Sequence, residues 1–219
     1  MAMKLCNFAS LDPALRMRRI KGLEGASRLD RDVWQEFHAD LNEAAPASEE
    51  AVRRLFRAGE NSELEVIPKK GVQVRRRRSS AATEALATVK QRRGQEYFRD
   101  AVINNSGGMC SVTGLAVREL LVASHILPWS THEQHRLDIR NGLSLSRLHD
   151  AAFDCGFIAF DENLRLLLSN RLKRELPSRT VAENFGAFEG EPLRFPEDAV
   201  LPEPAFLAEH RRSKFKRAA

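Results

Sequence analysis

Three side chains between residues 125 and 149, two imidazoles and a carboxamide, are of types that could serve the hydrolysis of a phosphodiester bond. Asn141 follows His125 by 16 residues, and His149 follows Asn141 by 8. Hydrolysis needs an activated water, stabilisation of the charge that develops around phosphorus and help for the leaving oxygen, most of which one metal ion and one general base can supply. His125 suits the base because imidazole titrates near neutral pH. A carboxamide or a backbone carbonyl that bonds the far ring nitrogen would fix the tautomer.

The surrounding residues predict the elements that position these side chains. Residues 119–126 form a strand pattern that ends at the histidine, a loop covers residues 128–140, and residues 142–145 form a second strand. A helix is expected from about Arg147 to Phe153. Antiparallel pairing of the strands would return Asn141 beside His125. We expect His149, which opens the helix, to face the same cleft, where it could ligate a metal.

Residues 93–173 resemble the HNH endonuclease family through five ordered motifs. The resemblance implies an α+β protein in which a ββα-metal HNH domain follows a helical N-terminal region. It also implies His125 as the catalytic base, Asn141 as the orienting residue and His149 as a metal ligand. A restriction or defence role against DNA is the setting that it suggests. The motifs are Gly94-Gln95-Glu96-Tyr97-Phe98-Arg99, Cys110-Ser111-Val112-Thr113-Gly114, Ala123-Ser124-His125-Ile126-Leu127-Pro128-Trp129, Asn141-Gly142-Leu143-Ser144-Leu145 and Leu148-His149-Asp150-Ala151-Ala152-Phe153-Asp154.

The chain departs from the family immediately before the base. Many HNH nucleases have a metal-binding aspartate there, and this chain has Ser124. Asp154 or Asp150 could replace the missing carboxylate, or Asp154 could brace the hairpin that follows. An oxygen-rich site favours Mg²⁺, whereas histidine ligation leaves Mn²⁺, Ni²⁺ or Zn²⁺ open. A non-catalytic DNA-binding protein on the same scaffold is the alternative function.

The rest of the chain divides by pattern and composition. Residues 1–60 are expected to be helical, with one helix capped by Ser27 and another by Ser48. Residues 61–83 are expected to be a basic linker, residues 84–185 the nuclease domain, and residues 186–219 a proline-rich irregular tail with a short helix and a basic end.

Positive charge is concentrated before the nuclease motifs. Residues 1–94 contain 19 Lys and Arg against 13 Asp and Glu, whereas residues 95–185 contain 10 against 11. A basic stripe attracts polyanions by releasing counterions, although a solvated linker is the plainer interpretation. Arg99 could clamp a phosphate or pair with Glu96 or Asp100 instead. The candidate DNA-binding residues are Arg75, Arg76, Arg77, Arg78, Arg93, Gln95 and Arg99.

Composition excludes several other classes of protein. No apolar run approaches the roughly 20 residues that span a bilayer, and the N-terminus lacks a signal-peptide pattern, so we expect a cytoplasmic protein without a membrane partner. Three widely spaced cysteines without a Cys-x-x-Cys pair exclude a four-cysteine zinc ribbon. DNA is the expected partner, and a homodimer would explain how one site per chain could cut two strands.

Overall fold

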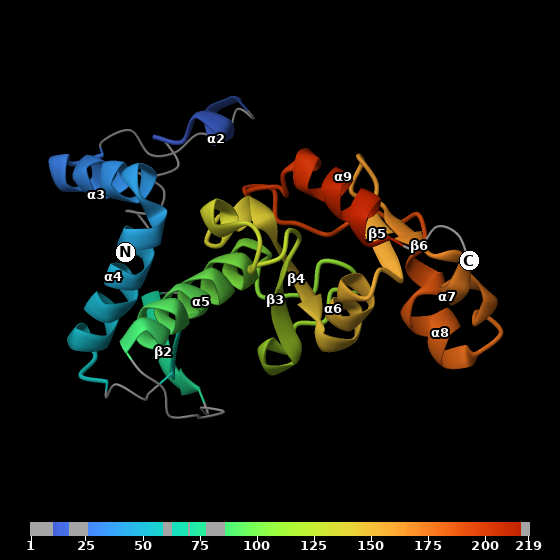
Figure 1. The fold of residues 1–219 in the computed structure, drawn as a ribbon. Coiled ribbons are helices and arrows are strands. Elements are labelled where there is room, and N and C mark those ends of the chain that lie inside the picture. The colour runs from blue at the N-terminus through green and yellow to red at the C-terminus, as the bar shows by residue number, and fades with distance from the viewer. Residues whose placement is uncertain (1–10, 18–25, 59–62, 70, 78–85, 216–219) are drawn as a thin grey trace. The chain divides into compact units, whose positions relative to one another are not determined.

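The computed structural model describes residues 11–17, 26–58, 63–69, 71–77 and 86–215 (Figure 1). The chain divides into two compact units, Met1–Asp100 and Ala101–Ala219. Helices dominate the first unit, and the second combines helices with short antiparallel strands, which confirms the α+β class. No helix among the described residues is long and apolar enough to cross a membrane.

The first unit begins with the helices α2 (Pro13–Met17), α3 (Arg28–Ala39) and α4 (Leu41–Leu55). Ser27 caps α3 as predicted: its hydroxyl accepts from the Asp30 N–H, and the Asp30 carboxylate accepts from the Ser27 N–H. The expected cap at Ser48 is wrong. Asp40 caps α4 eight residues before Ser48. Pro46 is accommodated inside the helix, where the Ser48 hydroxyl donates to the carbonyl of Ala45.

The segment expected to be a basic linker contains a hairpin. Strands β1 (Glu63–Lys69) and β2 (Gly71–Arg77) pair antiparallel, with Val66 opposite Val74 and Glu65 opposite Arg75. The register thus sets acidic positions of β1 opposite arginine positions of β2. Arg78, one of the candidate DNA-binding residues, lies outside the described residues.

Helix α5 (Leu86–Asn105) runs across the boundary between the two units. Its first-unit part carries Arg93 and Glu96, which are both buried and ion-paired with each other at 3.3 Å. Arg53 of α4 binds the same Glu96 carboxylate at 3.0 Å. Burial raises the pKa of Glu49 to about 7, and the negative charges of Asp100 and Glu96 contribute to this rise.

The second unit is built on a ββα arrangement. Strands β3 (Leu121–His125) and β4 (Gly142–Ser146) pair antiparallel, with His125 opposite Gly142, and α6 (Arg147–Asp154) follows directly. Ser146 caps α6 by accepting from the His149 N–H. This agrees with the predicted strands and helix. The described part of this unit also contains four short 3₁₀ turns: Arg118–Leu120, Glu133–His135, Ile139–Asn141 and Gly186–Phe188.

A second hairpin and three helices follow α6. Strands β5 (Ile158–Phe160) and β6 (Leu166–Leu168) pair antiparallel, and the helices are α7 (Asn170–Arg174), α8 (Arg179–Asn184) and α9 (Pro204–Ser213). One apolar cluster joins them to the ββα arrangement, with Leu143, Phe153 and Leu207 among its buried members. The tail is therefore part of the domain core, because Leu207 of α9 is almost completely buried.

Candidate functional site

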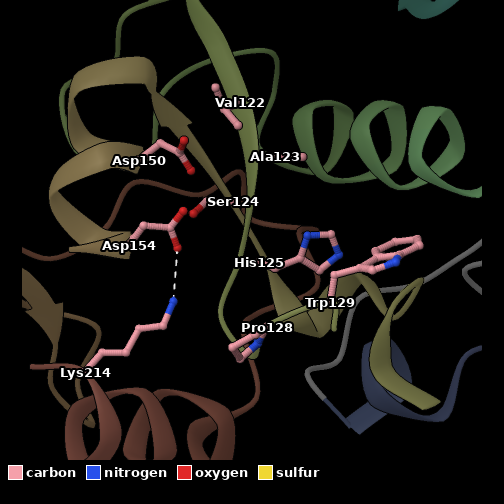
Figure 2. Close-up of a pocket in the computed structure, with 9 residues that line it drawn as sticks. All are labelled: Val122, Ala123, Ser124, His125, Pro128, Trp129, Asp150, Asp154 and Lys214. Carbon is pink, nitrogen blue, oxygen red and sulfur yellow. Dashed lines mark hydrogen bonds and ion pairs between the residues drawn. The ribbon is translucent and has the colours of Figure 1, made fainter. Parts of the chain in front are cut away.

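A pocket of about 440 Å³ opens where β3 faces α6 and the end of α9. Figure 2 shows Ser124 and two aspartates on one side of β3, with the His125 ring and Trp129 on the other. This division follows from the alternation of side chains along a strand. The lining residues are Val122, Ala123, Ser124, His125, Pro128, Trp129, Asp150, Asp154 and Lys214.

His125 ends β3, and a backbone carbonyl holds its ring. The Nε2 atom lies 2.9 Å from the carbonyl oxygen of Arg136, to which it must donate. In the neutral ring the proton is therefore on Nε2 and the lone pair on Nδ1. Burial lowers the pKa of His125, although the Arg136 carbonyl and the charge of Asp154 act in the opposite direction. His125 is thus neutral, and able to accept a proton, at a lower pH than an ordinary histidine.

The loop after β3 braces the imidazole from a second direction. The Trp129 ring meets the His125 ring edge to face at a centroid distance of 5.4 Å. The Arg136 guanidinium lies 5.3 Å from the centre of the Trp129 ring and donates from Nε to the Trp129 carbonyl. Trp129 therefore packs between the His125 ring and the Arg136 side chain.

Asn141 holds this loop and does not touch the His125 ring. It is fully buried; its Oδ1 accepts from the Leu127 N–H at 2.8 Å, and its Nδ2 donates to the carbonyls of Leu127 and His135. The strand pairing does bring it beside the histidine, because the Ile126 N–H donates to the Asn141 carbonyl. Asn141 therefore acts on His125 through the loop, and the carbonyl of Arg136 bonds the ring.

Two carboxylates on α6 face the other half of the pocket. Asp150 and Asp154 are one helical turn apart, so their side chains share a face. Burial raises the pKa of Asp150, and the charge of Asp154 raises it further. Ser124 Oγ is buried and has no hydrogen-bond partner within 3.5 Å among the described residues, but its dipole lowers the Asp150 pKa. A buried, unpartnered oxygen therefore points toward two carboxylates.

His149 does not line this pocket, which corrects the expectation that it faces the cleft of His125. Its Nδ1 lies 2.8 Å from Ser146 Oγ and its Nε2 2.8 Å from the Asn184 carbonyl oxygen. The ring packs against Phe185 and is almost completely buried, which lowers its pKa. With both nitrogens bonded inside the core, His149 fixes α6 against α8 and offers no nitrogen to a metal ion in the pocket.

The candidate DNA-binding residues differ in exposure. Arg93 is buried and bonds Glu96 and Glu50, so its guanidinium is held inside the first unit, which corrects its expected phosphate contact. Gln95 is exposed and Arg99 is partly exposed on the same helix. Arg75, Arg76 and Arg77 lie in β2.

Sequence reasoning missed Lys214. Its Nζ lies 3.2 Å from Asp154 Oδ1 inside the pocket lining. The predicted basic end included this lysine, but its separation from Asp154 by 60 residues gave no spacing that would connect the two.

The donors in the pocket fit a hard divalent cation. Carboxylate and hydroxyl oxygens are the ligands that Mg²⁺ and Mn²⁺ prefer, usually with several waters in the remaining positions. Among the described residues, no three His, Cys, Asp or Glu side chains gather closely enough to form a complete protein cage. The Ser124 hydroxyl and the two aspartates therefore suit an ion that keeps part of its water shell.

Comparison with protein families finds one match to the elements that form the pocket. No curated protein matches the chain. A family model described as HNH endonuclease matches residues 110–161, which include β3, the loop held by Asn141, β4 and α6. Residues 110–161 of this chain are therefore similar to the HNH endonuclease family.

Proposed function

We propose that the protein is an endonuclease that hydrolyses DNA with a divalent metal ion and acts in restriction or defence. The observation that supports this most is the pocket itself. It is lined by an imidazole whose Nε2 donates to a carbonyl, by two carboxylates and by a buried hydroxyl. The family match supports a nuclease domain, and the defence role rests on the resemblance alone.

His125 acts as the general base. Its lone pair on Nδ1 accepts a proton from the attacking water, and the positive charge that develops on the ring is stabilised by the Nε2 bond to the Arg136 carbonyl. Trp129 and the Asn141-held loop keep the ring in one orientation during this transfer. The lowered pKa keeps His125 neutral at physiological pH.

Asp150, Asp154 and Ser124 hold the cation, with Mg²⁺ or Mn²⁺ favoured by these oxygen donors. A bound divalent ion supplies stabilisation of charge on the phosphate and on the leaving oxygen. Asp154 takes the role of the aspartate that many HNH nucleases have immediately before the base histidine. Ser124 contributes at most a neutral oxygen, so the carboxylates of α6 supply the negative charge.

DNA is the proposed substrate, and β2 and α5 contribute to its binding. Arginine side chains at positions 75–77 and the exposed Gln95 are suited to the phosphate backbone and to polar contacts. One site per chain can cut one strand at a time. Two copies acting together would be needed for a concerted double-strand break.

Cleavage of supercoiled plasmid in Mg²⁺ or Mn²⁺ tests the function. The chain should convert the plasmid to nicked circles, and His125→Ala should reduce the rate by about 10²- to 10⁴-fold, because that is the usual contribution of a general base. His132→Ala is the matched control, since His132 lies partly exposed in the same loop and bonds Thr131.

Two outcomes would reject the nuclease assignment. An intact plasmid with both proteins, combined with a gel shift that shows DNA binding, would establish a non-catalytic DNA-binding protein. Equal cleavage by the chain and by His125→Ala would show that the imidazole is not the base.

A further inference from the structure

Helix α9 lies outside the segment that matches the HNH family, yet several contacts fix it to the catalytic half of the domain. The His210 ring stacks on Phe153 of α6 at 3.7 Å with an interplanar angle of 8°, and its Nε2 donates to the Phe153 carbonyl. Arg211 donates to the carbonyl of Phe160. These contacts fix the end of α9 beside the end of α6.

A glycine lets the two chain segments approach closely. Gly156 has φ of +71°, and a Cβ at this position would lie 2.0 Å from the Lys214 carbonyl oxygen. No other residue could adopt this conformation and leave that contact intact. The backbone of Lys214 is therefore seated directly on the turn that follows Asp154.

The Lys214 ammonium is consequently delivered into the pocket. Its Nζ pairs with Asp154 Oδ1 at 3.2 Å, and its charge also acts on Asp150. Figure 2 shows Lys214, the residue that follows α9, reaching toward Asp154 on the same side of β3 as Ser124 and Asp150. Two carboxylates one turn apart repel each other, and a positive charge between the end of α9 and α6 relieves that repulsion.

We propose that Lys214 is the internal counter-ion of the Asp150 and Asp154 pair, and that a divalent cation must displace its ammonium from Asp154 in order to bind. This inference rests on the proposed function insofar as it takes the two aspartates as the metal-binding pair. Lys214 is then a positioning residue. It holds the Asp154 side chain in place before the cation arrives and competes with the cation for the same carboxylate.

Direct measurement of Mn²⁺ binding by electron paramagnetic resonance tests this without any cleavage assay. Lys214→Met in the full chain should bind Mn²⁺ about five- to tenfold more tightly, since a partly exposed ion pair is a modest competitor. Lys214→Arg should stay within about twofold of the unmodified chain, because it keeps the charge. Lys214→Gln gives a second neutral side chain should the methionine variant fail to fold.

Arg212→Met is the matched control, because it also removes one positive charge, two residues before Lys214. The Arg212 side chain is exposed and pairs with Glu209. Its Mn²⁺ affinity should change by less than about twofold, because exposed charges at a distance are screened. In a chain that already carries Asp154→Asn, adding Lys214→Met should no longer increase the affinity for Mn²⁺.

Three results would overturn the proposal: unchanged or weaker Mn²⁺ binding by both neutral Lys214 variants, an equal gain in Arg212→Met, or a gain that survives Asp154→Asn. A gain specific to Lys214, found together with absent plasmid cleavage, would support the counter-ion and reject the nuclease function. The two proposals can therefore fail separately.

Discussion

His125 is held by a backbone carbonyl, a tryptophan ring and the strand that ends at its own position. The carbonyl bond fixes which nitrogen carries the proton, and the surrounding burial lowers the pKa of the imidazole. These two effects have different consequences. Orientation decides whether Nδ1 can take a proton from the attacking water, and the pKa decides at which pH the ring is able to accept that proton.

The pH dependence of cleavage should reflect the lowered pKa of His125. Because the base must be neutral, the cleavage rate should rise with pH, and the half-maximal rate should fall below pH 6.5, the ordinary histidine value. Plasmid cleavage at saturating Mn²⁺ between pH 5 and 8 measures this. A half-maximal rate clearly above pH 6.5 would contradict the inferred environment of the ring.

Asn141 should matter for stability as well as for activity. Asn141→Ala leaves the buried Leu127 N–H and two carbonyls without their partner, and it should lower the free energy of unfolding by about 3 kcal/mol. Denaturant titration measures the change, with Asn163→Ala in an exposed turn as the control. A loss below about 1 kcal/mol would mean that water replaces the carboxamide without cost.

At the scale of elements, local sequence patterns predicted the ββα arrangement well. Residues 119–126 and 142–145 read as strands because their apolar residues are bounded by turn residues, and antiparallel pairing then brought Asn141 beside the histidine strand. The direction of His149 could not be predicted in this way. Its ring turns inward because Asn184 and Phe185, 35 and 36 residues later, provide a carbonyl and an aromatic wall.

Tertiary packing also overrode local signals elsewhere. Pro46 and Ser48 are typical of a helix start, but Asp40 supplies the earlier cap and α4 continues through the proline. Arg93 belongs to a basic run by sequence, but Glu96 one turn later and Arg53 of α4 place it in a buried ionic cluster. The basic run alone gives no information on which arginines remain exposed.

Acid should loosen α9 through His210. Burial lowers the pKa of His210 to about 4, and its Nδ1 is buried without a partner among the described residues, so protonation there is unfavourable. Between pH 6.5, the ordinary histidine value, and about pH 4, the folded state thus holds fewer protons than the unfolded chain. The stabilising contribution is complete above pH 6.5 and is lost as the pH falls toward 4, by about 3 kcal/mol in total.

Denaturant unfolding of His210→Gln tests this, because glutamine retains a donor for the Phe153 carbonyl but does not titrate. The variant should lose less stability than the unmodified chain between pH 7 and 4.5. His132→Gln, at a partly exposed loop position, serves as the control. Identical pH profiles for His210→Gln and the unmodified chain would show that another group causes the acid sensitivity.

At the scale of the whole molecule, charge separates between the two units. Residues 1–100 contain 20 of the 35 Lys and Arg and 15 of the 30 Asp and Glu, so the net charge of +5 resides in the first unit and the second is neutral. General attraction to DNA is therefore expected from the first unit, and the chemistry from the second.

The salt dependence of DNA binding should depend on the basic residues of the first unit. Changing Arg75, Arg76, Arg77 and Arg78 to alanine should flatten the slope of log affinity against log salt by up to about 3 to 4, since each phosphate contact contributes about 0.9. Fluorescence anisotropy with a short duplex measures the slope. The control removes four exposed charges from the second unit, Arg171, Lys173, Arg174 and Arg179. An unaltered slope in the β2 variant would leave these arginines as a solvated surface.

Because Lys214 packs on Gly156 from a distant part of the sequence, the aspartates are synthesised before their counter-ion. Asp154 leaves the ribosome 60 residues ahead of the lysine that neutralises it, an interval of about 3 to 12 s at ordinary rates of translation. During that interval the nascent aspartates are open to any cation in solution.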